Sequence, residues 1–527
     1  MHAIFGRGLI VLPLYFIVTL LIGAVARRQA SNANSFLNAS RSLPLGIVIA
    51  AFLAANCGAL EVVGLSAMAA QYGVKAFHFY WIGAIPAMVF LALWMMPIYR
   101  KSGIRSIPEY LQLRYGPKVR LLNAYVLAIT MLLFAGISLY AMAQVLEAVL
   151  GVGFLASVTF SASVVLIYIL LGGVRATIYN EVFQLLVMVA GLTPLAWRTA
   201  RLALDASHSR SASSHLWIGM PVASTKAPLD GVGIVVGLGF VLSFSYWCTD
   251  FVLMQRAFAA RTEHAARQVP LWAGFGKLAF SLIVVLPGLA AARYLPGLGH
   301  APRFDQALPL MMTAFYGRGM LGLGLTAMVA SLMSGLAANV SAFAAIWTQD
   351  IYAVQWRSGQ SDRHYLLMGR ASTLVATGAS IFTSYLTFYF ADIMEHVQMI
   401  FSIFGAPFWA IFLLGMLSKR TTARGAVAGF LSGCTLGTLH LVALRRGWLH
   451  YGSTMNANFH LAIYSFALSV FVAWLVSGSD SGDPSAYTPE HPFFDWRSIT
   501  WGRRQWLLYV LSGSLLLACC LLNWFWR

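Results

Sequence analysis

Charged residues are scarce in this chain of 527 residues, and acidic residues are fewer than basic ones. Asp, Glu, Lys and Arg together form 10% of the sequence, whereas hydrophobic residues form 59%. A soluble fold needs far more charge to cover its surface, so the composition excludes an ordinary soluble protein. The longest polar stretches, about 198–229 and 478–503, are loop-sized, and no segment resembles an independent soluble domain.

The chain also lacks the groupings expected of a metal site or an enzyme. Its five cysteines fall in apolar stretches, show no metal-ligand spacing and avoid the predicted external loops. Its twelve histidines are scattered. We therefore expect no catalytic activity and no cofactor, and a membrane-embedded enzyme is the least favoured function.

Fourteen apolar stretches follow one another along the chain. Crossing ~30 Å of hydrocarbon as a helix takes roughly 20 apolar residues, so each stretch can span a bilayer. The sequence predicts an all-α membrane protein with about 14 transmembrane helices, near residues 9–26, 44–69, 77–99, 121–148, 153–171, 176–197, 230–250, 270–292, 319–347, 365–390, 393–418, 423–444, 458–477 and 505–525.

The formal net charge of +18 could suggest a nucleic-acid partner, but its distribution does not. With the N-terminus outside, the predicted cytoplasmic loops hold most of the Lys and Arg. That bias is the positive-inside rule, which orients a helical bundle in a membrane. The basic excess indicates a lipid bilayer as the partner, with no nucleic acid.

Two of the predicted helices contain residues that break an apolar helix. The stretch 44–70 carries Asn56, Gly58 and Glu61 at its middle, and we expect it to unwind near 55–58 and expose backbone carbonyls. The stretch 231–250 is glycine-rich at its start and ends in polar and aromatic residues. Interrupted helices at matching positions are typical of inverted-repeat transporters with a midplane site, although channels and membrane enzymes also have them.

Other polar residues lie within apolar stretches, and each has two interpretations. Lys277 must reach the membrane surface or pair with a carboxylate, for which Glu61 and Asp250 are the candidates. Ser331 and Ser334 share a helix face, which suits either a sodium ion or close helix packing. Glu181 either caps its helix or takes part in cation release to the cytoplasm.

Several segments together resemble the sodium/solute symporters, and most of all the sodium/glucose and sodium/galactose cotransporter branch. The resemblance covers about residues 36–430. The segments that carry it, in chain order, are FLNASRSLPLGIVIAAFLAAN, PIYRKSGIRSIPEYLQLRYG, GGVRATIYNEVFQ, YWCTDFVLMQRAFAAR, SLMSGLAANVSAFAAIWTQDIY and FGAPFWAIFLLGMLSKRTTARGA.

The resemblance implies a core of two inverted five-helix repeats, each with a broken first helix, and solute uptake by alternating access. The corresponding segments are an extra N-terminal helix and cytoplasmic loop (1–43), the first repeat (44–200), an external loop (201–229), the second repeat (230–418) and C-terminal helices (419–527). The implied location is the plasma (cytoplasmic or inner) membrane.

The resemblance also implies a sodium site. Its members here are Ala54, Cys57, Ser331, Ser334 and Gly335, with Glu181 as a further cation-binding residue. Family members commonly carry a serine at the position of Gly335, so one side-chain oxygen is missing. Glu181 replaces a family aspartate by a longer carboxylate, and Asn180 replaces the threonine before it.

The positions implied for the solute supply directed hydrogen bonds and aromatic faces, as a sugar requires. Glu61 departs from the neutral or imidazole side chain usual in the family. A glutamate expected near the start of the third helix is absent, and Tyr80-Trp81 occupies that stretch. The implied solute-binding residues are Asn56, Glu61, Ser243, Tyr246, Trp247, Lys277 and Gln398.

We therefore predict a cation-coupled symporter, with sodium as the coupling ion and a sugar or polyol as the favoured solute. A proton-coupled symporter of the same fold is the first alternative, because Glu61, Glu181 and Asp250 could each titrate. A solute sensor or regulatory membrane protein that does not transport is the second. It is motivated by Gly335 and the Asn180–Glu181 pair.

Overall fold

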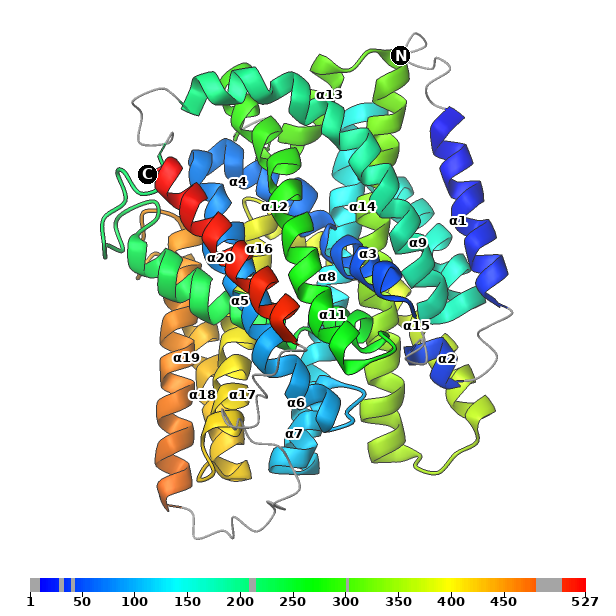
Figure 1. Cartoon of the computed structure of the whole chain (residues 1–527), viewed down its shortest axis with the longest axis vertical. Coiled ribbons are helices and arrows are strands. Elements are labelled where there is room, and N and C mark those ends of the chain that lie inside the picture. Colours follow the sequence, from blue (N-terminus) through cyan, green and yellow to red (C-terminus); the bar gives the residue numbers. More distant parts are fainter. Residues whose placement is uncertain (1–9, 28–32, 39–42, 208–214, 300–302, 480–504) are drawn as a thin grey trace.

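The protein is a bundle of long helices, shown by a computed structural model that describes residues 10–27, 33–38, 43–207, 215–299, 303–479 and 505–527 (Figure 1). The helices in chain order are α1 (Val11–Arg27), α2 (Ala33–Asn38), α3 (Leu45–Asn56), η3 (Leu60–Gly64), α4 (Leu65–Tyr72), η4 (Gly73–Phe77), η5 (Phe79–Ala84), α5 (Ile85–Phe90), η6 (Leu91–Met95), α6 (Met96–Lys101), α7 (Ile107–Tyr115), α8 (Pro117–Leu150), α9 (Phe154–Ser207), η8 (Gly233–Leu242), α10 (Ser243–Thr249), α11 (Phe251–Phe258), α12 (Glu263–Tyr294), η9 (Phe304–Gln306), α13 (Ala307–Phe315), α14 (Arg318–Ala345), η10 (Ile346–Trp356), α15 (Asp362–Ser384), η11 (Tyr385–Tyr389), α16 (Ile393–Ile400), η12 (Phe401–Gly405), α17 (Ala406–Leu417), α18 (Ala423–Arg445), α19 (Thr454–Ser479) and α20 (Trp506–Phe525).

Each predicted transmembrane stretch coincides with helix in the described residues. Nine helices there are long and apolar enough to cross a membrane, and eleven if two bent pairs count as single spans. Helix α1 is shorter than these, α15 is not among them, and α9 contains two predicted spans that meet at the non-helical Gly173. The all-α membrane fold is confirmed, while the predicted segment boundaries stay a prediction.

The first broken helix unwinds where the sequence predicts. Helix α3 ends at Asn56, Cys57 and Gly58 are not helical, and the chain continues through η3 and α4 at an angle of 55° to α3. The second break lies at the end of its predicted stretch. The glycine-rich part forms the wide helix η8, and the chain bends by 46° at Asp250, whose extended backbone (ψ 125°) separates α10 from α11.

Helix α9 turns back on itself at Gly173, which separates the two predicted spans. Gly173 has a φ of 57°, a backbone conformation that residues other than glycine rarely adopt. A Cβ atom there would lie 2.5 Å from the carbonyl oxygen of Phe36 in α2. Glycine is therefore required both by the backbone angle and by the close packing of α2 against this corner.

Several helices extend beyond their apolar stretches. Helix α12 begins at Glu263, and α14 continues as η10 to Trp356. Thr262 caps α12 by accepting a hydrogen bond from the Ala265 backbone N–H. Hydropathy marks only the part of a helix in hydrocarbon, whereas caps and turns decide where the helix begins and ends.

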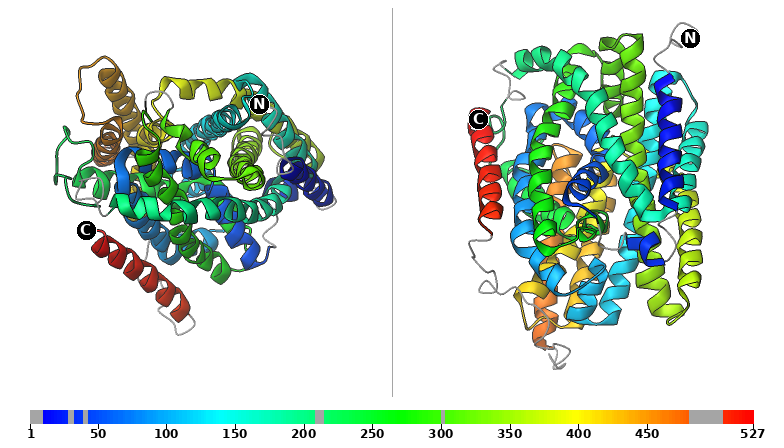
Figure 2. Two further views of the ribbon diagram at one scale, coloured as in Figure 1. Left: turned by 90° about the horizontal axis from the view of Figure 1, so that it is seen from above. Right: turned by 45° about the vertical axis from the view of Figure 1, so that its right-hand side comes forward.

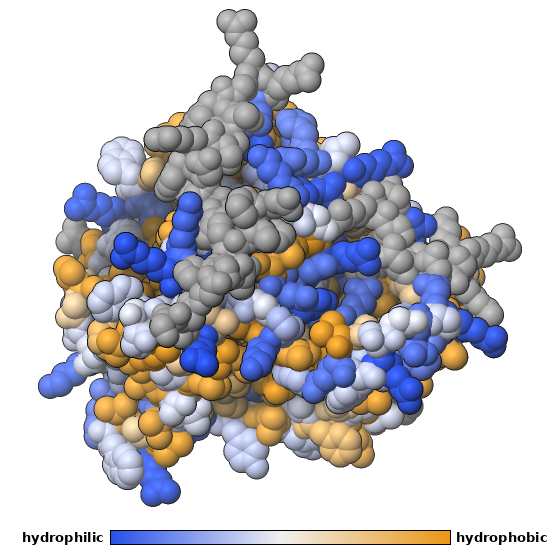
Figure 3. Space-filling view, turned by 90° about the horizontal axis from the view of Figure 1, so that it is seen from below, coloured by the Kyte–Doolittle hydropathy of each residue, from blue (hydrophilic) through white to orange (hydrophobic). Residues whose placement is uncertain are grey.

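The peripheral helices present apolar side chains outward. Helices α1 and α20 lie on the outside of the bundle, whereas α3 lies within it (Figure 2). Leu14 and Leu21 of α1 are 57% and 58% exposed, as expected of side chains that face lipid. Hydrophilic side chains gather among apolar ones on the lower face (Figure 3). The polar sites described below lie inside this apolar shell.

Candidate functional site

The seven predicted solute-binding residues line one cavity between the two broken helices. Asn56 and Glu61 come from the first broken helix, and Ser243, Tyr246 and Trp247 come from the second. Lys277 of α12 and Gln398 of α16 complete the set. The structure thus brings together residues from four separate helical segments, and their role in binding stays a prediction.

An ion pair forms the polar wall of this cavity. The Lys277 Nζ atom lies 2.6 Å from a carboxylate oxygen of Glu61, and both side chains are at least 95% buried. The ammonium also lies 5.6 Å from the ring centre of Tyr80 and 5.5 Å from that of Trp247, close enough for cation–π attraction. Of the two carboxylates proposed for Lys277, the structure therefore selects Glu61.

The cavity contains hydrogen-bonding atoms that no described residue satisfies. These are the Glu61 Oε1, Asn56 Oδ1 and Gln398 Oε1 atoms and the Tyr80 hydroxyl. A buried polar atom without a partner costs free energy, of the order of 1–3 kcal/mol. Such atoms around a cavity indicate a ligand or water that supplies the partners.

Tyr246 lies at the boundary between this cavity and a second one. Its hydroxyl accepts a hydrogen bond from the Asn56 amide, and its ring packs against Phe401 at 5.3 Å between ring centres. Asn56, Leu60, Tyr246 and Phe401 line both cavities. The second cavity also receives Ser138, Asp250 and Asn339, so it is polar as well.

The predicted cation-binding oxygens converge where α3 unwinds against α14. The Ser331 hydroxyl donates to the Cys57 carbonyl at 2.6 Å, and the Ser334 hydroxyl donates to the Ala54 carbonyl at 3.2 Å. All four residues are fully buried. Because α3 ends at Asn56, the Ala54 carbonyl lacks the N–H partner of a continuing helix. It is therefore available to the Ser334 hydroxyl or to a cation.

Gly335 supplies no side-chain oxygen to this cluster, but it allows α14 to approach the break closely. A Cβ atom on Gly335 would lie 3.4 Å from Gly58 Cα and 3.2 Å from the Ser138 hydroxyl. A Cβ atom on Gly58 would lie 3.2 Å from Gly335 Cα. The two glycines thus form a close backbone contact beside the two serines.

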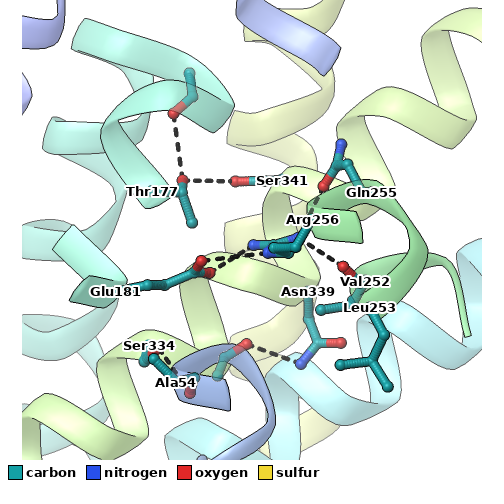
Figure 4. Close-up of polar contacts among 12 residues, drawn as sticks. Ala54, Thr177, Glu181, Val252, Leu253, Gln255, Arg256, Ser334, Asn339 and Ser341 are labelled. Carbon is teal, nitrogen blue, oxygen red and sulfur yellow. Dashed lines mark hydrogen bonds and ion pairs between the residues drawn. The ribbon is translucent and has the colours of Figure 1, made fainter. Parts of the chain in front are cut away.

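Glu181 is held by an arginine. Its carboxylate receives two hydrogen bonds from Arg256 of α11, at 2.6 and 3.3 Å, and both side chains have no exposed surface. Figure 4 shows this pair between the contact of Thr177 with Ser341 and the contact of Ser334 with Ala54. The cation role predicted for Glu181 stays a prediction, since no hydrogen bond joins it to the serine cluster among the described residues.

Three residues of these sites were not predicted from the sequence. Tyr80 lies in the segment where the family glutamate is absent, and that departure from the family pattern could have marked it as a site residue. Arg256 lies in the quoted segment YWCTDFVLMQRAFAAR and could have been proposed as the partner of Glu181. Ser138 lies in an otherwise apolar stretch, and only the packing of α8 against Gly335 brings it to the second cavity.

The profile of the sodium:solute symporter family matches residues 36–433. The sodium/glucose cotransporter of Vibrio parahaemolyticus is 26% identical over 465 residues, which cover 81% of this chain and 84% of that protein. Sodium/myo-inositol cotransporter 2 of Sus scrofa is 27% identical over 471 residues, or 82% of this chain and 69% of that protein.

Solved structures show the same fold. A sodium-coupled sialic acid symporter in a substrate-bound outward-open state superposes with a TM-score of 0.77 at 18% identity, over 89% of this chain and 97% of that one. Mhp1, a nucleobase-cation-symport-1 family transporter, superposes with a TM-score of 0.52 at 10% identity, over 86% of this chain and 96% of that one. These likenesses concern the fold alone.

Proposed function

The chain belongs to the sodium:solute symporter family and is a multi-pass membrane protein that couples a small solute to sodium; from this premise we propose that its solute is a sugar or polyol. The observation that supports this choice is the cavity that seven side chains from four helical segments line together. The relatives named above, which carry glucose and myo-inositol in their names, agree with a polyhydroxylated solute.

The chemistry of the cavity suits a neutral molecule with many hydroxyl groups. Glu61, Asn56 and Gln398 offer unsatisfied acceptors, and Lys277 offers ammonium protons beside Glu61. Two neighbouring hydroxyls of one solute could therefore donate to the carboxylate and accept from the ammonium. Trp247 adds an apolar face of the kind that packs against a sugar ring.

Sodium binding would use the cluster at the break of α3. Carbonyl and hydroxyl oxygens are suitable ligands for a hard cation, and a hydroxyl can turn its lone pairs toward the ion. The two serines already contact the carbonyls of Ala54 and Cys57, so the oxygen ligands lie together before the ion binds. A cation there would hold α14 and the broken helix together.

The same broken helix carries Asn56 and Glu61 into the solute cavity. Sodium and solute would therefore stabilise one arrangement of this helix, and each would raise the affinity for the other. Displacement of Tyr246, which lines both cavities, would open a route to the second one. Alternating access would then deliver the solute in the direction of the sodium gradient. We expect the protein in the plasma (cytoplasmic) membrane, where such a gradient is maintained.

The test is uptake of radiolabelled glucose, galactose and myo-inositol into proteoliposomes that contain the purified protein. We expect an inward sodium gradient to accelerate uptake of at least one of them, and an equal choline gradient to have no such effect. Ser334→Ala should abolish the acceleration, while Ser432→Ala on α18, outside both cavities and the cation cluster, is the matched control.

Other outcomes of the same assay decide between the alternatives. Uptake that follows a pH gradient and ignores sodium would replace sodium by protons as the coupling ion. Solute binding without any uptake would indicate a sensor. Failure of all three solutes, together with sodium-driven uptake of an amino acid or a carboxylate, would overturn the proposed solute class.

A further inference from the structure

The contact between Glu181 and Arg256 belongs to a buried network in which the guanidinium donates four hydrogen bonds. Two of its nitrogens donate to the Glu181 carboxylate, and the third donates to the Val252 carbonyl at 3.1 Å and the Gln255 side-chain oxygen at 2.8 Å. Gln255 in turn donates to the Leu37 carbonyl of α2. Arginine stays protonated at any physiological pH, so Glu181 always has a positive charge beside it.

The register of α9 against α14 places this pair next to the cation cluster. Thr177 contacts Ser341 at 3.1 Å, and a Cβ atom on Gly191 would lie 2.4 Å from Ala327. From Thr177 to Gly191 the chain advances fourteen residues along α9, while the facing residue on α14 moves back fourteen residues, from Ser341 to Ala327. The two helices are therefore antiparallel, and their register is the same at both contacts. In this register Glu181 lies opposite Ala337, less than one turn from Ser334.

The residues of α14 opposite Glu181 offer no oxygen from a side chain. Ala337 and Ala338 are both buried, and their side chains are methyl groups. The hydroxyls of Thr177, about one turn before Glu181 on α9, and of Ser341 are hydrogen-bonded to each other. A mobile cation at Glu181 would have to displace Arg256, which already donates to both carboxylate oxygens.

We infer that the Arg256 guanidinium is the permanent counter-cation of Glu181, so that each transport cycle carries one mobile cation, bound at the Ala54, Cys57, Ser331 and Ser334 cluster. This inference rests on the proposed sodium coupling and adds a coupling ratio of one sodium per solute. Arg256 is a positioning residue here, because it fixes Glu181 and α11 without contacting the mobile ion.

A ratio of one sets the charge moved per cycle. The two ion pairs, Glu61 with Lys277 and Glu181 with Arg256, are each neutral within the protein. With a neutral solute, the net charge that crosses the membrane in a cycle is that of the single sodium ion. The driving force for transport would then depend on the membrane potential as expected for one elementary charge moved per cycle.

The test is to count bound sodium by equilibrium binding of radioactive sodium to the purified full-length protein, by scintillation proximity against choline. We expect one sodium per chain at saturation in the wild type. The double variant Glu181→Gln/Arg256→Gln, neutral at both positions, should still bind one, whereas Ser331→Ala/Ser334→Ala should bind none. The matched control is Arg120→Gln/Asp350→Asn, which neutralises an ion pair at the end of the bundle that carries α7 and should also bind one.

The possible results separate this inference from the proposed function. Two sodium ions per wild-type chain, or loss of binding in the Glu181→Gln/Arg256→Gln variant, would overturn the single-cation inference and leave sodium coupling intact. Absence of saturable binding in the wild type would overturn the coupling and the inference together. Because the wild-type count is decisive by itself, the test stands even if a variant fails to fold.

Discussion

The two buried ion pairs of this protein differ in what surrounds them. Glu61 and Lys277 face a cavity, and one carboxylate oxygen of Glu61 has no partner among the described residues. Glu181 and Arg256 are packed on all sides, and both carboxylate oxygens receive hydrogen bonds. One pair is therefore open to a ligand, and the other is closed.

The basic residue in each pair, arginine in one and lysine in the other, fits this difference. Arginine presents a planar set of donors that matches a carboxylate on two sides, so it suits a contact that stays fixed. Lysine carries a compact ammonium with three rotatable donors, which can be shared between Glu61 and a ligand. Buried charge alone thus does not mark a binding site, whereas buried charge with unused hydrogen-bonding capacity beside a cavity does.

The largest effect should come from removing one member of the closed pair. Glu181→Ala leaves the Arg256 charge buried and unpaired, which typically costs about 3–5 kcal/mol. We expect the variant to lose a large part of its thermal stability in detergent. Ala338→Gly, a nearby substitution without change of charge, is the control for general loosening of α14. Wild-type stability in Glu181→Ala would show that Arg256 has another partner.

The second prediction compares neutral versions of both pairs. Glu61→Gln/Lys277→Met should fold but lose sodium-driven uptake by about a hundredfold, or about 2.8 kcal/mol at 1.4 kcal/mol per tenfold. Glu181→Gln/Arg256→Gln should keep most of its uptake, since neither residue contacts the solute cavity. Uptake of the best solute from the panel above measures both. Equal losses in the two variants would refute the distinction between an open and a closed pair.

A smaller effect is expected at Gly335. The variant Gly335→Ser adds a hydroxyl near the cation cluster, but its Cβ atom would crowd Gly58 and the Ser138 hydroxyl. The double variant Gly335→Ser/Ser138→Ala removes the tighter of these two contacts and should bind sodium several-fold more tightly than Gly335→Ser alone. Sodium-dependent thermal shifts of the two variants provide the measurement. An equal or weaker shift in the double variant would mean that Ser138 does not limit this site.

The smallest effect concerns a buried carboxylate that lies beside another acid. Asp305, in η9 outside the membrane spans, accepts a hydrogen bond from the Ile393 backbone N–H, next to Asp392. Burial first, and then the charge of Asp392, raise the pKa of Asp305 to about 8 from 3.8. The folded state therefore holds this proton more tightly than the unfolded state does.

The contribution of Asp305 to stability is fully present below about pH 4 and is lost as the pH rises toward 8. Asp305→Asn keeps an acceptor for Ile393 and cannot ionise, so it should flatten the decline of the melting temperature between pH 5 and 8. The difference should be on the order of 1–2 °C. Asp362→Asn, at the other end of the bundle, is the control. An unchanged slope in Asp305→Asn would mean that Asp305 is ionised throughout.

Much of the fold could be predicted because a bilayer imposes strict rules on sequence. Apolar length located the helices, and the polar interruptions at Asn56 and Glu61 located the first break. The second break was placed less well, because Gly233–Leu242 stays helical and the bend occurs at Asp250. Glycine permits a break, but tertiary packing decides whether it occurs.

The sequence limited the possible ion-pair partners of the buried charged residues but did not identify them. Two carboxylates were possible partners for Lys277, since sequence does not fix the distance between helices. Arg256, the partner of Glu181, lies 75 residues away on the second broken helix and was not proposed from the sequence. Contacts of this kind depend on crossing angles and register, and a single sequence does not contain them. The residues of the solute cavity were found through resemblance, because their spacing along the chain shows no pattern.

Tyr246, one of the four residues that line both cavities, has a consequence for inhibitor design. A transported molecule must fit on one side of the Tyr246 ring at a time. A longer molecule, with a polar head beside Lys277 and a tail that reaches Asp250, would keep the ring displaced and hold both broken helices at once. Such a compound would arrest the transporter instead of being carried by it.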